Sequence, residues 1–407
     1  MRKKAGIWIW SLLLAGILWL GGCNRPSTDF GTAGEREKAE ESVSRTRDAQ
    51  KADRRKETRA AVKPPYEKSM ELQFAQGFGV DYYEGGYIIL TTFMDNRCFL
   101  VVPEGMPVPE EIPKPDVILY RPIRNLYLVA SSAMDMFCKL DGLDAITLSG
   151  QKEEGWYIEE AQQAMADGTI LYAGKYNQPD YELIVSKNCS LAIENRMITH
   201  APEVVEKLES FHIPVMVEYS SYESHPLGRV EWIKFFGALL GKEEEANRVF
   251  EEQADILKNV TEGERTDKTV AFFFITSNNL VQVRQSSDYV PKMIELAGGR
   301  YVFEELGDLD SKRSTLNMQV EEFYDSAKDA DFLIYNSSID GGCTSLKELL
   351  EKCELLADFK AVQQGNVYCT TNDMYQQSMS IGYLIEDIHT MLTGKEEKEM
   401  RYLFQLK

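Results

Sequence analysis

The chain has 407 residues, 43% of them hydrophobic, and a formal net charge of −20 at pH 7. That length and apolar content allow two domains, each with its own hydrophobic core. Such an acidic chain repels a polyanion, so nucleic acid is excluded as a partner. The sequence contains only four histidines, and a dedicated cluster of metal ligands is therefore not expected.

Residues 1–23 have the layout of a secretory signal. Basic residues at positions 2–4 precede an apolar run, Ala5–Leu20, which is shorter than the roughly 20 residues that a membrane-spanning helix needs. The Leu-Gly-Gly-Cys sequence that ends at Cys23 resembles a bacterial lipobox, in which the cysteine becomes the lipid-modified N-terminus after cleavage. We therefore predict that Cys23 is lipidated and holds the protein on the outer face of the bacterial cytoplasmic membrane. The alternative is an uncleaved membrane anchor with an incidental cysteine.

Residues 24–65 are predicted to be a disordered, charged tether. They contain 11 Lys and Arg and 8 Asp and Glu, and almost no large apolar residue. Such a segment cannot bury enough apolar surface to offset the entropy that it loses on ordering. Because residues 1–23 and residues 24–65 each carry a net charge of +3, residues 66–407 must carry −26 to give the total of −20. A basic tether suits an anionic lipid surface, with the acidic body standing away from it.

The body begins with a β-rich element that we predict to be a hairpin. The strand-like segments Gln73–Tyr83 and Tyr87–Thr92 flank a Gly-Gly pair, which is a signal for a tight turn. A third strand is expected at Cys98–Val102. We assign this element to an N-terminal lobe that spans residues 66–227.

After Pro122, short apolar strands alternate with segments of helical length. Continuous apolar strands separated by helices indicate a mostly parallel sheet that is covered on both faces. Strands are predicted at Leu126–Ala130, Ala145–Leu148, Leu191–Ile193 and Val215–Val217, and helices at Ser132–Leu140, Ile158–Asp167, Tyr181–Lys187 and Pro202–Phe211.

Residues 228–262 are predicted to form two linking helices, Gly228–Leu240 and Lys242–Val260. Apolar residues recur along one face of the second helix, which spans roughly 30 Å at 1.5 Å per residue. A C-terminal lobe, residues 263–407, then resumes the alternation. Its strands are predicted at Val270–Ile275, Phe332–Tyr335 and Val367–Cys369, and its helices at Tyr289–Ala297, Val320–Ala327, Ser345–Leu355 and Ser378–Leu392. The predicted fold class is α/β: two lobes, each a mostly parallel sheet flanked by helices, joined by one long interlobe helix, with an extra N-terminal β-hairpin.

Several local motifs between Arg124 and Leu392 resemble the iron-complex/cobalamin class of solute-binding proteins, which deliver ligands to ABC importers. The motifs follow one another in the family's order and cover about two thirds of the chain. They are Pro179–Val185, which leads into a strand, Ile213-Pro214-Val215 at a strand entry, Leu239–Ala246 at the connection into the interlobe helix, and Ala297-Gly298-Gly299 after a C-lobe helix.

The resemblance implies a binding protein and not an enzyme. It implies a monomer that captures an iron complex, such as a siderophore or haem, or cobalamin, between its lobes and delivers it to the permease subunits of an ABC transporter. No intrinsic cofactor is implied, although the bound ligand would contain Fe(III) or cobalt. Aromatic residues favour a large flat ligand and arginines an anionic one, so corrinoid and ferric siderophore both remain open.

Ligands of such proteins bind where loops converge at the carboxyl ends of parallel strands. Trp156 and Tyr157 are candidates to stack on a flat ligand, with the alternative that one of the two covers the edge of the core. His225 is a candidate contact to an iron complex, with helix capping as the alternative, and Arg284 and Arg196 are candidates to pair with anionic groups. The predicted ligand contacts are Ser131, Ser132, Trp156, Tyr157, Asn195, Tyr222, Glu223, His225, Arg284, Tyr289, Asn336 and Tyr375.

The resemblance also implies one acidic residue on each lobe that meets arginines of the permease. Glu182 matches the N-lobe position and Glu321 the C-lobe position, with Glu322 as the alternative to Glu321. Complementary charge at such positions sets orientation and association rate more than affinity. The alternative is that each glutamate is simply favoured at the start of a helix by the helix dipole.

Two other function classes remain as alternatives. One is a ligand-sensing surface lipoprotein of the same fold that takes no part in transport. The other is an extracytoplasmic enzyme, although the sequence contains no G-x-S-x-G, H-E-x-x-H, P-loop or glycine-rich dinucleotide motif.

The cysteines of the body form no C-x-x-C pair. We predict that they are free, mostly buried thiols, with a disulfide as the alternative.

Overall fold

The structure is a computed structural model, and it describes residues 63–307, 314–337, 342–395 and 399–407. The predictions for the signal segment, for Cys23 and for nearly all of the tether lie outside these residues. Within them, no helix has the length and apolar character needed to cross a bilayer.

The body opens with a five-stranded sheet in the order β1-β2-β3-β4-β5. The predicted hairpin is the antiparallel pair β2–β3, whose turn places Gly85 and Gly86 at φ +83°. The predicted third strand is present as β4, and β1 and β5 extend the sheet by two strands beyond the prediction. Its strands are β1 (Tyr66–Ser69), β2 (Phe78–Tyr83), β3 (Tyr87–Thr92), β4 (Arg97–Val102) and β5 (Val117–Tyr120).

The segment before β2 is bound to helix α6 (Pro226–Leu240) instead of extending the strand as predicted. The backbone N–H groups of residues 73–75 donate to the carboxylate of Glu231 at 2.8 to 3.1 Å. Those of residues 76–77 donate to Glu223 at 2.8 to 3.1 Å. Both carboxylates are buried, and a buried charge is stable only when it is hydrogen-bonded or paired. Glu231 therefore fixes the segment before β2 to α6, and Glu223 fixes it to the turn that precedes α6.

The N-terminal lobe contains a five-stranded sheet in the order β12-β11-β6-β7-β8, and every pairing in it is parallel. All predicted strands and helices of this lobe are present, with bounds that differ by a few residues. Its strands are β6 (Leu126–Leu128), β7 (Ile146–Ser149), β8 (Leu171–Tyr172), β11 (Leu191–Asn195) and β12 (Val215–Glu218), with a small separate pair of β9 (Gly174–Lys175) and β10 (Gln178–Pro179). Its helices are α2 (Ser131–Lys139), α3 (Glu159–Ala166), α4 (Tyr181–Ser186) and α5 (Pro202–Ser210).

Helix α6 is followed by α7 (Glu243–Thr261), which leads into the C-terminal lobe. Helix α6 is buried on nearly every side, whereas α7 buries one apolar face. Gly241 ends α6 in the left-handed conformation at φ 76°, where glycine has no steric penalty. The two helices approach closely at Gly237, because a Cβ atom built there would lie 2.6 Å from the Cβ of Ala246.

The C-terminal lobe contains a mixed sheet in the order β16-β14-β13-β17-β18-β19, with β15 also paired to β13. The pairings of β13 with β17 and of β17 with β18 are parallel, as predicted, but β14, β16 and β19 add antiparallel edges that the sequence did not reveal. Its strands are β13 (Thr269–Ile275), β14 (Val281–Arg284), β15 (Arg300–Tyr301), β16 (Thr315–Met318), β17 (Phe332–Tyr335), β18 (Val367–Thr370) and β19 (Leu403–Gln405). Its helices are α8 (Tyr289–Leu296), α9 (Val320–Ala327), α10 (Leu346–Lys352), α11 (Lys360–Gln364) and α12 (Ile381–Thr393).

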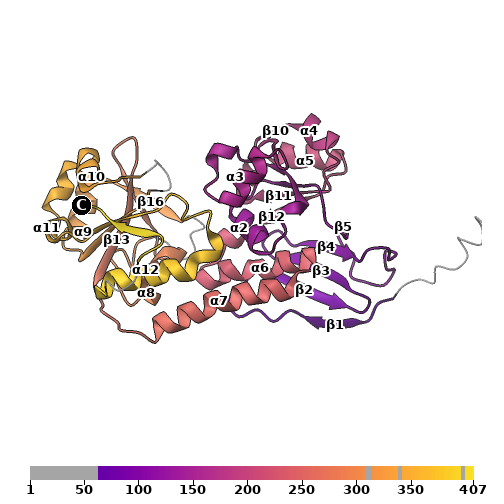
Figure 1. Ribbon diagram of the computed structural model, residues 1–407, viewed down its shortest axis with the longest axis horizontal. Coiled ribbons are helices and arrows are strands. Elements are labelled where there is room, and N and C mark those ends of the chain that lie inside the picture. Colours follow the sequence, from indigo (N-terminus) through magenta and orange to yellow (C-terminus); the bar gives the residue numbers. More distant parts are fainter. Residues whose placement is uncertain (1–62, 308–313, 338–341, 396–398) are drawn as a thin grey trace, which may run out of the picture. The chain divides into compact units, whose positions relative to one another are not determined.

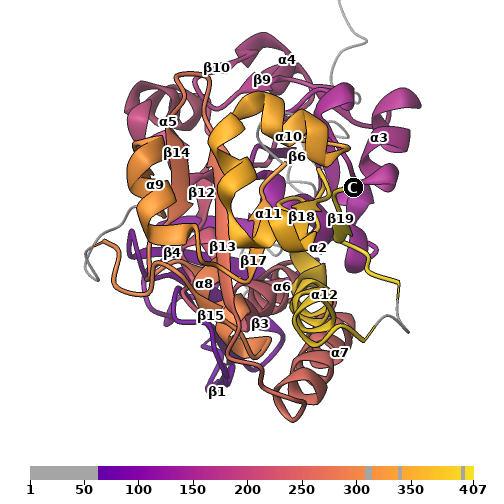
Figure 2. The ribbon, with the colours of Figure 1, turned by 90° about the vertical axis from the view of Figure 1, so that its left-hand side faces the viewer.

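Figure 1 shows the two α/β lobes side by side, with α12 below the C-terminal lobe, α6 below the N-terminal lobe and α7 extending beneath α6 toward the C-terminal lobe. Helices α7 and α12 pack against each other, and Figure 2 shows α12 beside α7 below the central strands of the C-terminal lobe. The predicted arrangement of two lobes joined through a long helix is therefore present. Cys98, Cys138, Cys189 and Cys353 are free thiols, as predicted.

Candidate functional site

A cavity of about 300 Å³ lies between the two lobes. Residues after the carboxyl ends of β6, β11 and β12 form its N-lobe wall, and α6, β14, α8 and the loop after β18 complete it. This is the edge at which open parallel sheets bind ligands. The lining residues are Ser131, Ser132, Asn195, Arg196, Met197, Ser221, Tyr222, Arg229, Arg284, Asp288, Tyr289, Ser314 and Tyr375.

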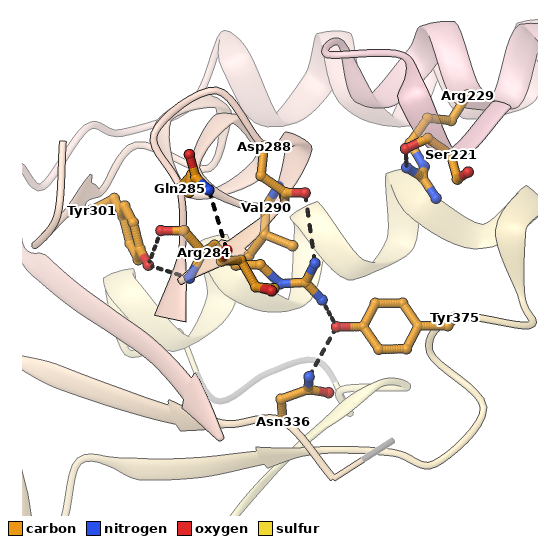
Figure 3. A network of polar contacts seen from close by, with 10 residues as sticks. Ser221, Arg229, Arg284, Gln285, Asp288, Val290, Tyr301, Asn336 and Tyr375 are labelled. Carbon is orange, nitrogen blue, oxygen red and sulfur yellow. Dashed lines mark hydrogen bonds and ion pairs between the residues drawn. The ribbon is translucent and has the colours of Figure 1, made fainter. Parts of the chain in front are cut away.

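Arg284 is the centre of a polar network on the C-lobe side of this cavity (Figure 3). Its guanidinium donates to the Tyr375 hydroxyl and lies 3.6 Å from the Asp288 carboxylate. The same hydroxyl accepts a hydrogen bond of 2.9 Å from the Asn336 side-chain amide. Asp288 also caps α8 by accepting the Val290 N–H at 3.0 Å. Arg284 is therefore held from two sides, with its end facing the cavity.

Two further arginines reach the cavity from the N-terminal half of the chain. Arg229 on α6 donates to the Ser221 carbonyl at 2.8 Å, and its guanidinium lies 3.9 Å from the ring centroid of Tyr289. Arg196, just after β11, lies 4.4 Å from the ring centroid of Tyr222. A guanidinium on an aromatic face is attracted by the ring quadrupole and keeps its N–H donors directed outward. Both arginines are thus placed to bind acceptor oxygens.

The electrostatic balance of the cavity is positive. Three guanidinium groups against one carboxylate give the described lining residues a net charge of +2. The chain as a whole carries −20, so this local excess of positive charge runs against the composition. Partly buried cations without counter-ions are costly, and an anionic ligand would relieve that cost.

The serines at the start of α2 are positioned by a buried carboxylate. The Ser132 hydroxyl donates to Glu218 Oε2 at 2.7 Å, and the second oxygen of Glu218 accepts the Ser220 N–H at 2.5 Å. Glu218 ends β12 and is 1% exposed. It therefore joins the start of α2 to the segment after β12 and fixes the Ser132 side chain in the N-lobe wall.

Seven of the twelve predicted ligand contacts line the cavity, although contact with a ligand itself remains a prediction. Asn336 is an eighth candidate that lies behind the wall, hydrogen-bonded to the hydroxyl of a lining tyrosine. The seven are Ser131, Ser132, Asn195, Tyr222, Arg284, Tyr289 and Tyr375.

Trp156 and Tyr157 do not line the cavity. Trp156 is 1% exposed and its indole N–H donates to the Ser149 hydroxyl at 3.2 Å, so it covers the edge of the core, the alternative given for one of this pair. Tyr157 is 45% exposed, and its backbone N–H donates to the side chain of Gln376 at 2.8 Å. An aromatic pair after a strand thus does not by itself reveal which way its rings face.

Glu223 and His225 also lie outside the cavity and have structural contacts. Glu223 accepts the Trp232 indole N–H at 3.0 Å in addition to the backbone bonds that hold residues 76–77. His225 caps α6, because its Nδ1 accepts the Leu227 N–H at 3.2 Å. Burial lowers the pKa of His225, which keeps the imidazole neutral and able to accept. Helix capping, the alternative for His225, is what the geometry supports.

Six lining residues were not among the twelve predicted ligand contacts. Arg196 had been named as a candidate to pair with anionic groups, and the other five are Met197, Ser221, Arg229, Asp288 and Ser314. Arg229 could not be singled out from the sequence, because Glu231 and Lys234 also lie in α6 and a charge points to a site only once its burial is known. Asp288 had a weak signal, since Asp before a helix is a common N-cap. The other three carry no feature that distinguishes them from ordinary loop residues.

Glu182 and Glu321 are exposed, and each lies in the first turn of its helix, α4 and α9 respectively. Glu322, the alternative to Glu321, is exposed in the same turn. Their geometry is compatible both with docking and with a helix start favoured by the dipole. In the described part of the chain, no group of three or more His, Cys, Asp or Glu side chains is arranged to hold a metal ion.

The family profile of periplasmic binding proteins matches residues 131–374, which is more than half of the chain. The chain belongs to the periplasmic binding protein family. This confirms the family resemblance found in the sequence and agrees with the two-lobed α/β fold. It is a family of binding proteins and not of enzymes.

Individual relatives of this periplasmic binding protein are distant. An uncharacterized lipoprotein of Methanocaldococcus jannaschii is 26% identical over 358 residues, which cover 84% of each chain. The periplasmic haem-binding protein HutB of Vibrio cholerae is 15% identical, with a TM-score of 0.54 over 66% of this chain and 98% of its own. A protein of an ABC-type Fe3+-hydroxamate transport system from Saccharomonospora viridis is 17% identical, with a TM-score of 0.51 over 66% of this chain and 93% of its own. At these identities the solved structures show a shared fold.

Proposed function

We propose that this protein is the extracytoplasmic solute-binding subunit of an ABC importer, and that it carries an anionic iron complex between its lobes. The single observation that carries the proposal is the cavity with a net charge of +2 in a chain of net charge −20. Solved relatives named for haem and for Fe3+-hydroxamate support an iron complex as the cargo. In this proposal the protein binds and releases its ligand without chemical change, so it is not an enzyme.

The lining favours a ferric siderophore or haem over cobalamin. Arg196, Arg229 and Arg284 offer planar donors that suit carboxylate and catecholate oxygens. One face of the Tyr222 ring and one face of the Tyr289 ring already face a guanidinium, which leaves less aromatic surface for a flat corrinoid. A volume of about 300 Å³ is at the small end of the usual range for ligand sites, and this also favours the more compact ligand.

We also propose that the protein works at a membrane surface. A lipid on Cys23 would hold it there, with residues 24–65 as the tether, and the relatives named as lipoproteins support this proposal.

The protein, as a monomer, would then contact the permease through Glu182 on one lobe and Glu321 on the other. Charge reversal at Glu182 should leave ligand affinity unchanged but impair uptake, because the glutamate is exposed on α4 and not in the cavity. If affinity is lost, or if uptake proceeds normally, docking is the wrong role for Glu182. Unchanged ligand uptake after deletion of a neighbouring permease would favour the sensor that does not transport.

The ligand class can be tested by calorimetric titration of residues 63–407 with four compounds. Ferric enterobactin is a triply negative tris-catecholate, haem carries two propionates, ferrichrome is a neutral tris-hydroxamate, and cobalamin is a corrinoid. We expect sub-micromolar binding to at least one of the two anionic iron compounds and at least tenfold weaker binding to ferrichrome and cobalamin. Equal affinity for the charged and neutral ferric complexes, or preference for cobalamin, would refute an anionic iron complex as the cargo.

A further inference from the structure

The loop after β18 makes a set of contacts to the opposite lobe that the cavity alone does not explain. We propose that residues 375–379, here called the clasp, fasten the two lobes together and make that fastening depend on what occupies the cavity. The inference deepens the proposed function and rests on it, because it assumes that the cavity is the ligand site. It assigns a role in ligand retention to Gln376, which does not line the cavity.

Gln376 joins the clasp to the N-lobe loop that follows η2 (Glu153–Gly155). Its amide nitrogen donates to the Gly155 carbonyl at 2.8 Å, and its amide oxygen accepts the Tyr157 N–H at 2.8 Å. Both functions of one side-chain amide are thus used by the backbone of the other lobe, in the way that a neighbouring strand would use them. Gln376 is only partly buried and Tyr157 is exposed, so water can replace these bonds when the lobes separate.

The other end of the clasp is held in the interior. The Ser378 hydroxyl donates to the Ser132 carbonyl at 2.7 Å, and the Met379 N–H donates to the carboxylate of Asp135 at 2.7 Å. Asp135 is 1% exposed on α2, and a buried hydrogen bond to a carboxylate is costly to break. The Met379 end is therefore a fixed point, and the Gln376 end is the one that can open.

Tyr375 connects the clasp to the cavity. Its hydroxyl is bonded to Arg284 and to Asn336, and its ring lies 5.2 Å from the Arg284 guanidinium. Because Arg284 and Tyr375 both line the cavity, an anion that pairs with Arg284 also changes the surroundings of this hydroxyl. Because Tyr375 and Gln376 are adjacent in the backbone, a shift at the first is transmitted to the second. One short segment thus links the binding of an anion in the cavity to the contact between the lobes.

The clasp can be tested without any ligand by hydrogen exchange at the Tyr157 amide of the full chain. We expect Gln376→Ala to raise the exchange rate of this amide roughly tenfold, because the Tyr157 N–H loses the side-chain oxygen of Gln376 as its hydrogen-bond acceptor. Gln376→Glu keeps an acceptor and should retain most of the protection. Gln163→Ala, which removes an exposed glutamine of α3 that bonds Asp167 in the same lobe, is the matched control and should change nothing at this amide. An exchange rate in Gln376→Ala that equals the control would overturn the clasp.

The link to the cavity needs its own variant and a ligand. Tyr375→Phe removes only a hydroxyl on the cavity side, yet it should also speed exchange at the Tyr157 amide several-fold; no change there would overturn the coupling. With ferric enterobactin as the probe, Gln376→Ala should dissociate several-fold faster with little change in association rate, whereas an unchanged dissociation rate would contradict a role in retention. Failure of ferric enterobactin to bind the wild type counts against the proposed ligand class, and the exchange measurements still decide the clasp.

Discussion

Glu194 is a buried acid whose replacement by glutamine should change how stability depends on pH. It lies on β11, is 0% exposed, and neither of its carboxylate oxygens has a hydrogen-bond partner in the described part of the chain. Burial raises its pKa from 4.5 to about 8. Between these values the folded protein keeps a proton that the unfolded chain loses, so the stability that this group contributes is complete below pH 4.5 and falls as pH rises, until it is lost above about pH 8.

The size of the effect follows from the two pKa values. A shift from 4.5 to about 8 corresponds to about 5 kcal/mol of unfolding free energy across that interval. At about 2 °C per kcal/mol for a domain of this size, the melting temperature should fall by up to about 10 °C through this group. Glutamine has nearly the same shape as glutamic acid but cannot ionise. In Glu194→Gln, residue 194 should therefore add no pH dependence to the free energy of unfolding over the same interval.

The assay is thermal or urea unfolding of residues 63–407 at intervals from pH 5 to pH 9. Asp135 and Asp387 also have pKa values raised by burial, to about 6, and they contribute in the same direction to both proteins. The quantity to follow is therefore the free energy of unfolding of Glu194→Gln minus that of the wild type. This difference should increase by several kcal/mol as pH rises. Glu203→Gln, at an exposed position on α5, is the control. Curves for wild type and Glu194→Gln that stay parallel from pH 5 to pH 9 would refute the reasoning.

Three further substitutions test other parts of the structure. Arg229→Gln removes one cavity cation. Calorimetry should find that anionic ferric complexes bind about tenfold to a hundredfold more weakly and that the affinity for ferrichrome is unchanged. Equal losses of affinity for both would argue against charge recognition. Glu231→Ala leaves the buried Lys234 ammonium, 2.9 Å away, and the N–H groups of residues 73–75 unpaired, and urea unfolding should show a loss of about 3 to 5 kcal/mol. Gly237→Ala forces a Cβ atom to within 2.6 Å of Ala246, so it should cost about 1 to 3 kcal/mol even though alanine is the better helix former; an increase in stability would show that α6 and α7 can separate freely.

The main elements of the fold could be predicted because their signals are local. The strand Leu191–Asn195 is a continuous apolar run and α7 has one apolar face, and each pattern depends only on neighbours in the sequence. The antiparallel edges of the C-terminal lobe were missed because β14 and β16 are short and amphipathic. Their pairing is also set by contacts distant in the chain. The start of β2 was misjudged for a similar reason: residues 73–77 look like a strand, but buried carboxylates some 150 residues away bind their backbone.

The candidate site was predictable where it depends on topology. Ser131, Asn195 and Tyr222 follow strands whose carboxyl ends converge, and that rule needs only the order of the elements. Side-chain direction could not be predicted, which is why Trp156 proved to be buried in the core. Arg229 was passed over because its helix was interpreted as a linker, and its charge becomes informative only once the burial of α6 is known.

The attachment of residues 73–77 to α6 has a mechanical consequence. Any pull on the chain upstream of residue 63 enters through β1 and is passed by Glu231 and Glu223 to a helix that touches β2 and α2 on one side and α8 and α12 on the other. Tension at the amino end of the body would therefore be shared with the helix that contacts both lobes, and the N-terminal sheet would not bear it alone.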